Sequence, residues 1–390
     1  MKQSIAIVAV AFNRLYSLQR LLRSLEKAYF EGEQNVPLII SIDKSDTDDV
    51  ERFADSYVWN YGEKRVIKHN KNIGLKAHVL GLGKWLDEFD AIVVLEDDVV
   101  VAEDFWYYVC QCVDVYESNE DIAGVSLYGF SINYHLRHPF IPLHVGGNDV
   151  YFMNCAMSWG QVWMRKSWKK FESWYQENQE FKSSLNLPES ICSWGDRSWL
   201  KYHTKYCMEE NKYFVFPYVS YSTNFSDAGV HISAADTIYQ VPLLQGKNHN
   251  LCLPIEVLGG VAYDGFFENK ELYRTLGCGE DDVCLDLNGA NSNRMSKRFW
   301  LTTKKLSYHV KEHFSIALKP IEQNVLQWNH EGNGIYLYDT SVPMPSPKDE
   351  GNPAFLVQHY IQNGFLFLRE YGFKNVLKDF LKVVKIKFGL

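Results

Sequence analysis

Four apolar runs within residues 4–95 constrain the fold of this chain more than any other feature of its sequence. Each run has the aliphatic, β-branched composition of a strand that is buried on both faces. Stretches with leucines at helical spacing lie between the runs. Strands and helices that alternate in this way predict an α/β fold with a doubly wound, mostly parallel sheet. The expected strands are 4–10, 37–43, 65–68 and 91–95, and the expected helices begin at Ser17, near Asp46, at Leu75 and at Asp104.

Polar side chains follow all four of these strands. In a parallel sheet the carboxyl ends of the strands share one edge, and ligands bind there. The residues are Asn13 and Arg14 after the first strand, Asp43 after the second, His69 after the third, and Glu96, Asp97 and Asp98 after the fourth. A nucleotide with a divalent ion fits this set, with Asp43 accepting from a base N–H and Arg14 and Lys76 near phosphate.

The three adjacent carboxylates of Glu96, Asp97 and Asp98 have two interpretations. They form an acidic turn that caps the next helix, or they hold a divalent cation that relieves their mutual repulsion. The first interpretation suits Asp104, which we expect to be a helix cap without chemistry. It does not explain three carboxylates directly after a buried strand, so both interpretations stay open from spacing alone.

Composition limits the classes of function. The chain has 390 residues, of which 46% are hydrophobic and 15% aromatic, so we expect a packed globular protein. The formal net charge of -8 argues against nucleic acid as the main partner. No apolar run is long enough to span a bilayer, and we interpret residues 4–10 as a core strand rather than a signal peptide. The eight cysteines show no zinc-binding spacing, and we expect them to be reduced.

The rest of the chain gives weaker signals. Residues 158–174 are Trp-rich and partly helical, residues 188–209 lead from a loop into a helix, and residues 214–221 form a strand. Short strands are expected at 314–318 and 334–338. Near the end, apolar residues of 376–384 share one helical face and lysines form the other, which fits either an amphipathic helix at a membrane surface or a helix packed on the domain.

Several motifs in residues 5–233 resemble glycosyltransferases of the A-type nucleotide-sugar-binding fold. Within that class the chain is most similar to the N-acetylglucosaminyltransferase family that starts complex N-glycan branching, and to bacterial relatives in surface-polysaccharide clusters. Those enzymes carry an EDD triplet where others have DxD, and here the segment reads VLEDDVVVAEDF. The other motifs that carry the resemblance are AFNR, NKNIGLKAH, MSWGQVWMRKSW, CSWGDRSWLKY, FVFPYVSYS and NFSDAGVHIS.

The resemblance implies a role for individual residues. Asp98 would ligate the metal, with Mn²⁺ favoured over Mg²⁺, and Glu96 and Asp97 would hold the ribose and the donor sugar. Asp43 and His69 would contact the base. The remaining donor-side residues are Asn13, Arg14, Asn72, Lys76, Trp159 and Trp194, and His231 lies in a Gly-His loop that would contact phosphate or metal.

The resemblance also names Asp196 as the general base that deprotonates the acceptor hydroxyl. The family places this base directly after a Trp, whereas here Gly195 lies between Trp194 and Asp196. The alternative is that Asp196 is the N-cap of the following helix, and one residue can do both. A single base with a single displacement predicts inversion at the anomeric carbon.

The organisation that follows is a glycosyltransferase domain over residues 1–242, with a donor half at about 1–125 and an acceptor half at about 126–242. An accessory region over 243–345 and a linker with the amphipathic helix over 346–390 complete it. The expected donor is a nucleoside-diphosphate sugar, with UDP favoured, and the expected acceptor is a glycan or a lipid-linked saccharide. Other readings are a sugar nucleotidyltransferase, disfavoured because AFNRLYS lacks glycine, and a non-catalytic sugar-binding protein. We expect a bacterial cytoplasmic enzyme, peripheral at the inner membrane face.

Overall fold

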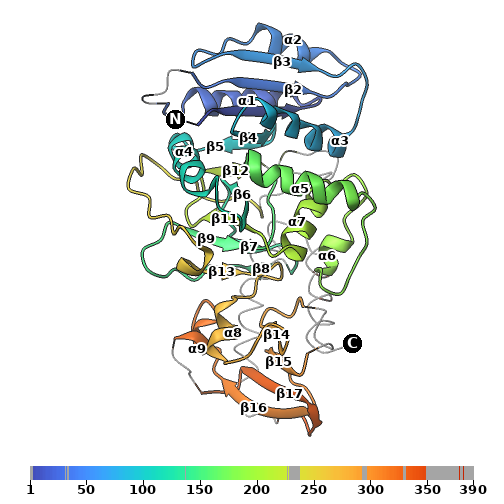
Figure 1. Cartoon of the computed structure of the whole chain (residues 1–390), viewed down its shortest axis with the longest axis vertical. Coiled ribbons are helices and arrows are strands. Elements are labelled where there is room, and N and C mark those ends of the chain that lie inside the picture. The colour runs from blue at the N-terminus through green and yellow to red at the C-terminus, as the bar shows by residue number, and fades with distance from the viewer. Residues whose placement is uncertain are drawn as a thin grey trace. The chain divides into compact units, whose positions relative to one another are not determined.

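The computed structural model describes residues 3–30, 32, 35–136, 138–225, 227, 238–291, 297–327, 331–347, 377 and 381. The chain divides into two compact units, each built from more than one segment (Figure 1). Unit 1 comprises Met1–Phe130, His144–Lys182 and Trp194–Gly260. Unit 2 comprises Ser131–Leu143, Ser183–Ser193 and Val261–Leu390. The two units interleave along the sequence. The predicted domain boundaries near residues 242 and 345 stay predictions.

A large sheet forms the centre of unit 1, with the strand order β9-β11-β6-β10-β4-β1-β2-β3. Strands β3, β2, β1 and β4 are mutually parallel. This confirms the predicted α/β fold with a mostly parallel sheet. β10 runs antiparallel to both β4 and β6, and β9 is antiparallel to β11. The strands are β1 (Ile5–Ala11), β2 (Leu38–Ile42), β3 (Lys64–Lys68), β4 (Ala91–Glu96), β6 (Ile122–Ser126), β9 (Val150–Met153), β10 (Gln161–Met164) and β11 (Tyr213–Pro217).

The expected strands form because they are apolar on both faces. Every residue of β1 and β2 is buried, as are the first five residues of β4. Helices with their apolar residues on one face cover the part of the sheet formed by β1–β4. In α1, for example, the leucines of that face are buried: Leu18, Leu21, Leu22 and Leu25. The helices of unit 1 are α1 (Leu15–Glu26), α2 (Asp49–Ser56), α3 (Leu75–Leu80), the 3-10 helix η1 (Gly81–Asp87), α4 (Phe105–Tyr116), α5 (Arg165–Glu177), α7 (Leu200–Glu209) and the 3-10 helix η2 (Val257–Gly259).

Two short strands complete unit 1 beside the acidic motif. The three valines after the EDD triplet form β5 (Val99–Val101), which pairs antiparallel with β12 (Ser222–Asn224). This ladder joins the acidic segment to the part of the chain that precedes the predicted Gly-His loop. The sequence did not predict it, because a three-residue strand carries no periodicity of its own.

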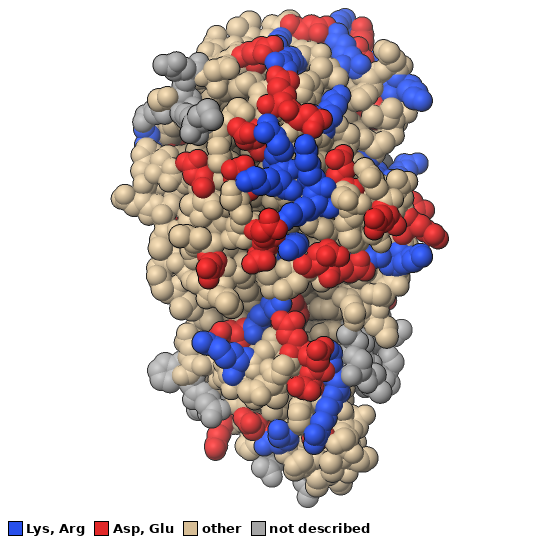
Figure 2. Space-filling view, viewed as in Figure 1, with Lys and Arg blue, Asp and Glu red and all other residues tan. Residues whose placement is uncertain are grey.

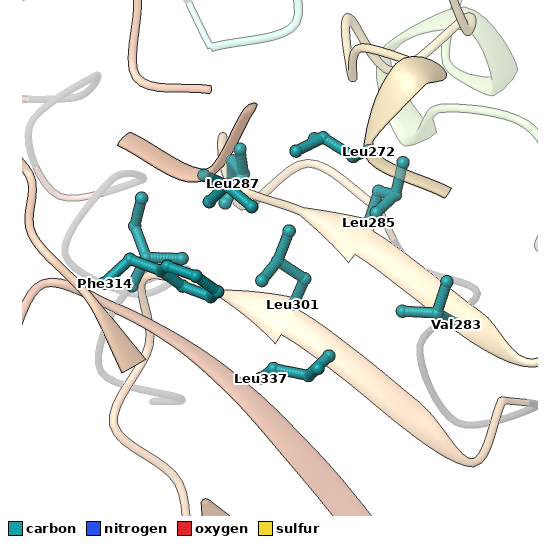
Figure 3. Packing of buried hydrophobic residues seen from close by; sticks show 9 residues of the cluster. Leu272, Val283, Leu285, Leu287, Leu301, Phe314 and Leu337 are labelled. Carbon is teal, nitrogen blue, oxygen red and sulfur yellow. The ribbon is translucent and has the colours of Figure 1, made fainter. Parts of the chain in front are cut away.

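Unit 2 contains a sheet with the order β14-β15-β17-β16. Its core consists of aliphatic residues with Phe314, and Figure 3 shows these side chains gathered over β14 and β15. The strands of this unit are β7 (Ile132–Asn133), β8 (His138–Pro139), β13 (Ala262–Tyr263), β14 (Val283–Asp286), β15 (Phe299–Thr302), β16 (Tyr308–Phe314) and β17 (Ile335–Pro343). Its helices are α6 (Glu189–Cys192), α8 (Glu271–Thr275) and α9 (Gln323–Leu326).

Some predicted boundaries were wrong. The helix expected to begin at Leu75 is a short α-helix followed by a 3-10 helix, and the strand expected over 314–318 instead ends at Phe314. The predicted C-terminal amphipathic helix lies outside the described residues, apart from Leu377 and Leu381. Within the described part of the chain, no helix is both long and apolar enough to cross a membrane.

Candidate functional site

The polar residues predicted at four strand ends do follow four strands of one sheet, and the register aligns the ends of these strands. The register pairs Val10 with both Ser41 and Glu96, and pairs Ser41 with Ile67. The strand order 3-2-1-4 reverses its winding direction between β1 and β4. In doubly wound sheets, ligands bind outside the strand ends at such a point. Arg14 follows β1 and the EDD triplet follows β4, so these residues flank the reversal.

Arg14 contacts the second and third carboxylates of the triplet. Its Nη2 donates to Asp97 Oδ1, and to Asp98 Oδ2 at 3.2 Å. Asp97 is buried, whereas about a quarter of the Arg14 side chain is exposed. Burial raises the pKa of Asp97 to about 7, against the opposing effect of the Arg14 charge. The guanidinium therefore offsets only part of the negative charge collected here.

Glu96 differs from its two neighbours in its partner. Burial, together with the charges of Asp98 and Asp97, raises the pKa of Glu96 to about 8. The side chain of Trp199, at the start of α7, is hydrogen-bonded to Glu96. Trp199 is itself buried. This contact connects the donor half of the predicted site with the acceptor half, and nothing in the sequence pattern indicated it.

The carboxylates fit a divalent cation in one specific respect. Oδ1 of Asp98 is buried and accepts no hydrogen bond from the described residues. An unpaired buried carboxylate oxygen is costly unless a cation or a donor fills the place. No group of three His, Cys, Asp or Glu side chains among the described residues is arranged to hold a metal by itself. Mg²⁺-type ions are often held by one or two carboxylates with substrate phosphates completing the shell, and this set suits that arrangement.

Asp43 is buried and holds the loop before α3. Its Oδ1 accepts from the backbone N–H groups of Lys44 and Ile73, each at 2.9 Å, and its Oδ2 accepts from Gly74 at 2.9 Å. Gly74 has φ +79, a conformation that favours glycine. Each carboxylate oxygen has two acceptor sites, so Oδ2 keeps one for a ligand N–H.

The other donor-side residues surround that loop. His69 and His78 lie edge to face with ring centroids 5.0 Å apart, and His78 shares a 2.8 Å hydrogen bond with Ser41. Asn72 is exposed and donates to the carbonyl of Lys44. Asn13 is exposed as well. The buried His78, whose pKa is lowered to about 4 mainly by burial, was missed because it lies inside the predicted helix.

Lys76 connects the donor side to α7. Its Nζ lies 5.1 Å from the ring centroid of Tyr202. The pKa of Tyr202 is raised by burial and by the nearby charge of Asp196. Tyr202 therefore lies close to one predicted donor residue and to the predicted base.

Asp196 is fully exposed, in the turn before α7. The structure contradicts the alternative that it caps this helix. α7 begins at Leu200, its N-cap position is Trp199, and no side chain makes a capping bond there. Asp196 therefore lies three residues before the cap position. Lys201 is buried, and its Nζ reaches the Trp194 carbonyl at 3.2 Å and Asp196 Oδ1 at 3.5 Å.

The prediction that Asp104 caps α4 needs a correction. Asp104 does occupy the N-cap position of α4, but its side chain makes no capping bond. The buried carboxylate instead accepts from the backbone N–H of Asn248 at 2.7 Å and lies 3.3 Å from His249 Nε2. Asp104 therefore connects the start of α4 to a segment far along the chain.

Of the remaining predicted residues, Trp159 is half-buried, with its ring beside Tyr128 and Tyr239 at centroid distances of 5.0 and 5.1 Å. Its carbonyl accepts from the Ser222 hydroxyl. Predicted His231 lies outside the described residues. The chain that leads towards it is tied to the acidic motif, because the N–H of Phe225 donates to the carbonyl of Asp98 at 2.8 Å.

Basic side chains gather over α5 on the face seen in Figure 2. Each has an acidic partner: Arg165 pairs with Asp90, Lys166 with Glu117, Lys169 with Asp87 and Lys170 with Glu120. These pairs offset the positive charge of α5, so the cluster does not form the uncompensated basic surface that nucleic acid requires.

Residues 6–171 match the family model described as glycosyl transferase family 2. The matched range holds Arg14, Asp43 and the EDD triplet, and it ends before Asp196. No curated protein matches the chain.

Several solved structures are similar at low identity. TarS of S. aureus, solved with UDP-GlcNAc, is 13% identical with a TM-score of 0.39, over 60% of this chain and 61% of that chain. A Pyrobaculum calidifontis mannosyltransferase, solved with GDP-Man and Mn²⁺, is 11% identical with a TM-score of 0.35, over 56% and 55%. GalNAc-T7, solved with UDP, GalNAc and Mn²⁺, is 15% identical with a TM-score of 0.38, over 55% and 43%. The chain covers less than two thirds of each, and likeness at this level assigns neither donor nor acceptor.

Proposed function

We propose that unit 1 is a metal-dependent, inverting glycosyltransferase that moves a sugar from a nucleoside-diphosphate sugar to an acceptor hydroxyl. The observation that carries the proposal is the position of Arg14 and the EDD carboxylates on either side of the β1/β4 reversal. A diphosphate bound there meets a guanidinium, a carboxylate oxygen without a partner, and the strand ends that bind nucleotides in this fold class.

The residues divide the work of binding. Asp98 offers its unpaired Oδ1 to a divalent ion, and Glu96 and Asp97 line the ribose and the donor sugar. Oδ2 of Asp43 has one acceptor site left for a base N–H. His69 directly follows β3, the strand next to the one that Asp43 follows. A bound divalent ion would offset the charge that builds on the leaving diphosphate. In the protein, the geometry of Asp43 is fixed by three backbone N–H groups, so its free site is already oriented.

Asp196 is our candidate for the base that takes the acceptor proton. It is exposed, so an acceptor can approach it from solvent, and it lies near Tyr202, whose ring is also close to Lys76. Trp194 and Trp159 are candidates for aromatic walls against the sugar rings. One carboxylate that removes one proton during one displacement would give inversion.

The finer features of the proposal follow the motif resemblance. We favour a UDP-sugar, with a hexosyl or N-acetylhexosaminyl group, and a glycan or lipid-linked saccharide as acceptor. That chemistry belongs to surface-polysaccharide biosynthesis at the cytoplasmic side of a bacterial membrane. His231 remains a proposed phosphate or metal contact.

A donor screen tests the proposal. UDP- and GDP-sugars are incubated with the full chain and Mn²⁺, and release of the nucleotide is measured with and without a chelator. We expect release for at least one donor, abolished by the chelator. Asp196→Asn should retain donor binding and lose transfer to an added acceptor. Absence of nucleotide binding for every donor would refute the proposed function, and transfer by Asp196→Asn would refute only the base assignment.

A further inference from the structure

Arg14 occupies carboxylate oxygens that a divalent ion would use. Its Nη2 bonds to Asp97 Oδ1 and lies 3.2 Å from Asp98 Oδ2, so the guanidinium bridges the two side chains. The Asp97 and Asp98 side chains are only 5% and 17% exposed, so water screens these charges poorly. The other Asp98 oxygen, Oδ1, is buried and has no partner among the described residues. Arg14 therefore places a fixed positive charge on one oxygen of Asp97 and one oxygen of Asp98, and Oδ1 of Asp98 is left for another ligand.

This arrangement penalises a free divalent cation. The cation must approach Asp98 Oδ1 while a guanidinium stays on the neighbouring oxygen, and the two positive charges repel each other in a poorly screened environment. A nucleoside diphosphate removes that penalty because its phosphate oxygens are negative ligands for both groups. The planar guanidinium has five donors, so it can keep a carboxylate and still bind phosphate.

We infer that Arg14 is a charge gate: the acidic triplet binds a divalent ion well only together with a nucleoside diphosphate, and loses this selectivity when the Arg14 charge is removed. The inference rests on the proposed function for its ligand but concerns the order of binding, which the function itself leaves open. Because binding free energies are reciprocal, the ion strengthens nucleotide binding by the same factor.

The test measures free Mn²⁺ by electron paramagnetic resonance while MnCl₂ is added to the protein, first alone and then with UDP or with GDP. For the wild type we expect weak binding of Mn²⁺ alone and binding at least about tenfold tighter with one of the nucleotides. For Arg14→Gln, we expect Mn²⁺ alone to bind at least about tenfold tighter than to the wild type, and the nucleotide to add little.

Two further variants separate charge from structure. Arg14→Lys keeps the positive charge and should keep the weak binding of Mn²⁺ alone. Arg20→Gln is the matched control, because Arg20 is also a carboxylate-paired arginine of this region, bonded to Asp227 and stacked on Phe225 at 3.6 Å. It should leave Mn²⁺ binding as in the wild type. If Arg14→Gln does not fold, Arg14→Met removes the same charge and takes its place, with the same expected result.

The outcomes are distinguishable from those of the donor screen. Equal Mn²⁺ affinity of the wild type with and without nucleotide would overturn the gate while leaving the glycosyltransferase proposal intact. The gate would also be overturned if Arg14→Gln bound Mn²⁺ alone no better than the wild type. It would be overturned as well if Arg14→Lys bound Mn²⁺ alone at least about tenfold tighter than the wild type. If no protein retains Mn²⁺ with either nucleotide, the gate and the proposed metal dependence both fail.

Discussion

The ammonium group of Lys201 lies 3.5 Å from Oδ1 of Asp196, although Lys201 is buried and Asp196 is fully exposed. The same Nζ donates to the carbonyl of Trp194 and lies 4.6 Å from the ring centroid of Phe181. A buried ammonium with so few acceptors is costly. Through its bonds to Trp194 and Asp196, Lys201 helps to hold the turn on which the proposed base lies.

Replacing Lys201 should therefore affect acceptor chemistry more than donor binding. Lys201→Met retains most of the buried volume but frees the turn, and we expect the rate of transfer to fall about tenfold or more. The KM for the donor should stay unchanged, and the ratio of donor hydrolysis to transfer should rise. Lys201→Arg should restore part of the transfer rate. An equal loss of donor affinity and transfer would contradict a positioning role.

Asp98 should be distinguishable from its acidic neighbours by nucleotide binding. Asp98→Asn removes a negative ligand from the triplet, so the increase in UDP or GDP affinity caused by Mn²⁺ should be lost. Glu103→Gln is the matched control, since Glu103 is an exposed carboxylate in the same segment that accepts from the Tyr29 hydroxyl. Isothermal titration with and without Mn²⁺ measures the effect. Loss of the Mn²⁺ effect in both variants would mean that it depends on general charge rather than on Asp98.

Asp104 should matter for stability and not for binding. Asp104→Ala removes the buried carboxylate that accepts from the N–H of Asn248, so we expect the free energy of unfolding to fall by about 1–3 kcal/mol. Urea denaturation measures this loss. Nucleotide affinity at a temperature well below the unfolding transition should be unchanged, and a weakened affinity there would assign Asp104 to the site after all.

His203 makes unit 1 sensitive to acid. It is fully buried, neither ring nitrogen has a partner among the described residues, and burial lowers its pKa to about 3. The unfolded chain takes up a proton on this residue below its ordinary pKa of 6.5, whereas the folded chain does not until about pH 3. Stability therefore falls as the pH drops through this interval, by about 2–3 kcal/mol at pH 4.5 for His203 alone.

His203→Phe should remove that loss, because Phe171 already stacks on the ring at 4.2 Å and an apolar ring suits the place. The measurement compares the free energy of unfolding at pH 7.5 and at pH 4.5 for both proteins. His78 contributes in the same direction in both, so the difference between the proteins isolates His203. Equal acid sensitivity of the two would show that His203 is not the cause.

The sequence predicted the parts of the fold that depend on local pattern. β1, β2 and β4 were recognisable because their residues are apolar without interruption, and parallel pairing then placed Arg14 and the EDD triplet on one edge. β10 was hidden in a Trp-rich stretch, and its antiparallel insertion between β4 and β6 depends on non-local pairing that no period reports.

The sequence predicted which residues belong to the candidate site more reliably than it predicted the contacts between them. Arg14 and Asp98 were expected near a diphosphate, but the bridge between them depends on side-chain reach across two strands. Asp104 was expected to cap its own helix, and its true partner is far along the chain. The bond from Trp199 to Glu96 was missed for the same reason: hydrogen-bond partners distant in sequence leave no trace in spacing.

The interleaving of the two units limits how the protein can be shortened. His135 in Ser131–Leu143 bonds to Ser190 in Ser183–Ser193 and to the carbonyl of Gly265 at 2.8 Å. An expression product that stops after residue 260 would keep the first two segments and lack the third. On the ribosome those two segments likewise emerge before their partner in the third segment is made. A minimal catalytic fragment therefore has to be made by replacing both segments with short linkers, rather than by choosing a single end point.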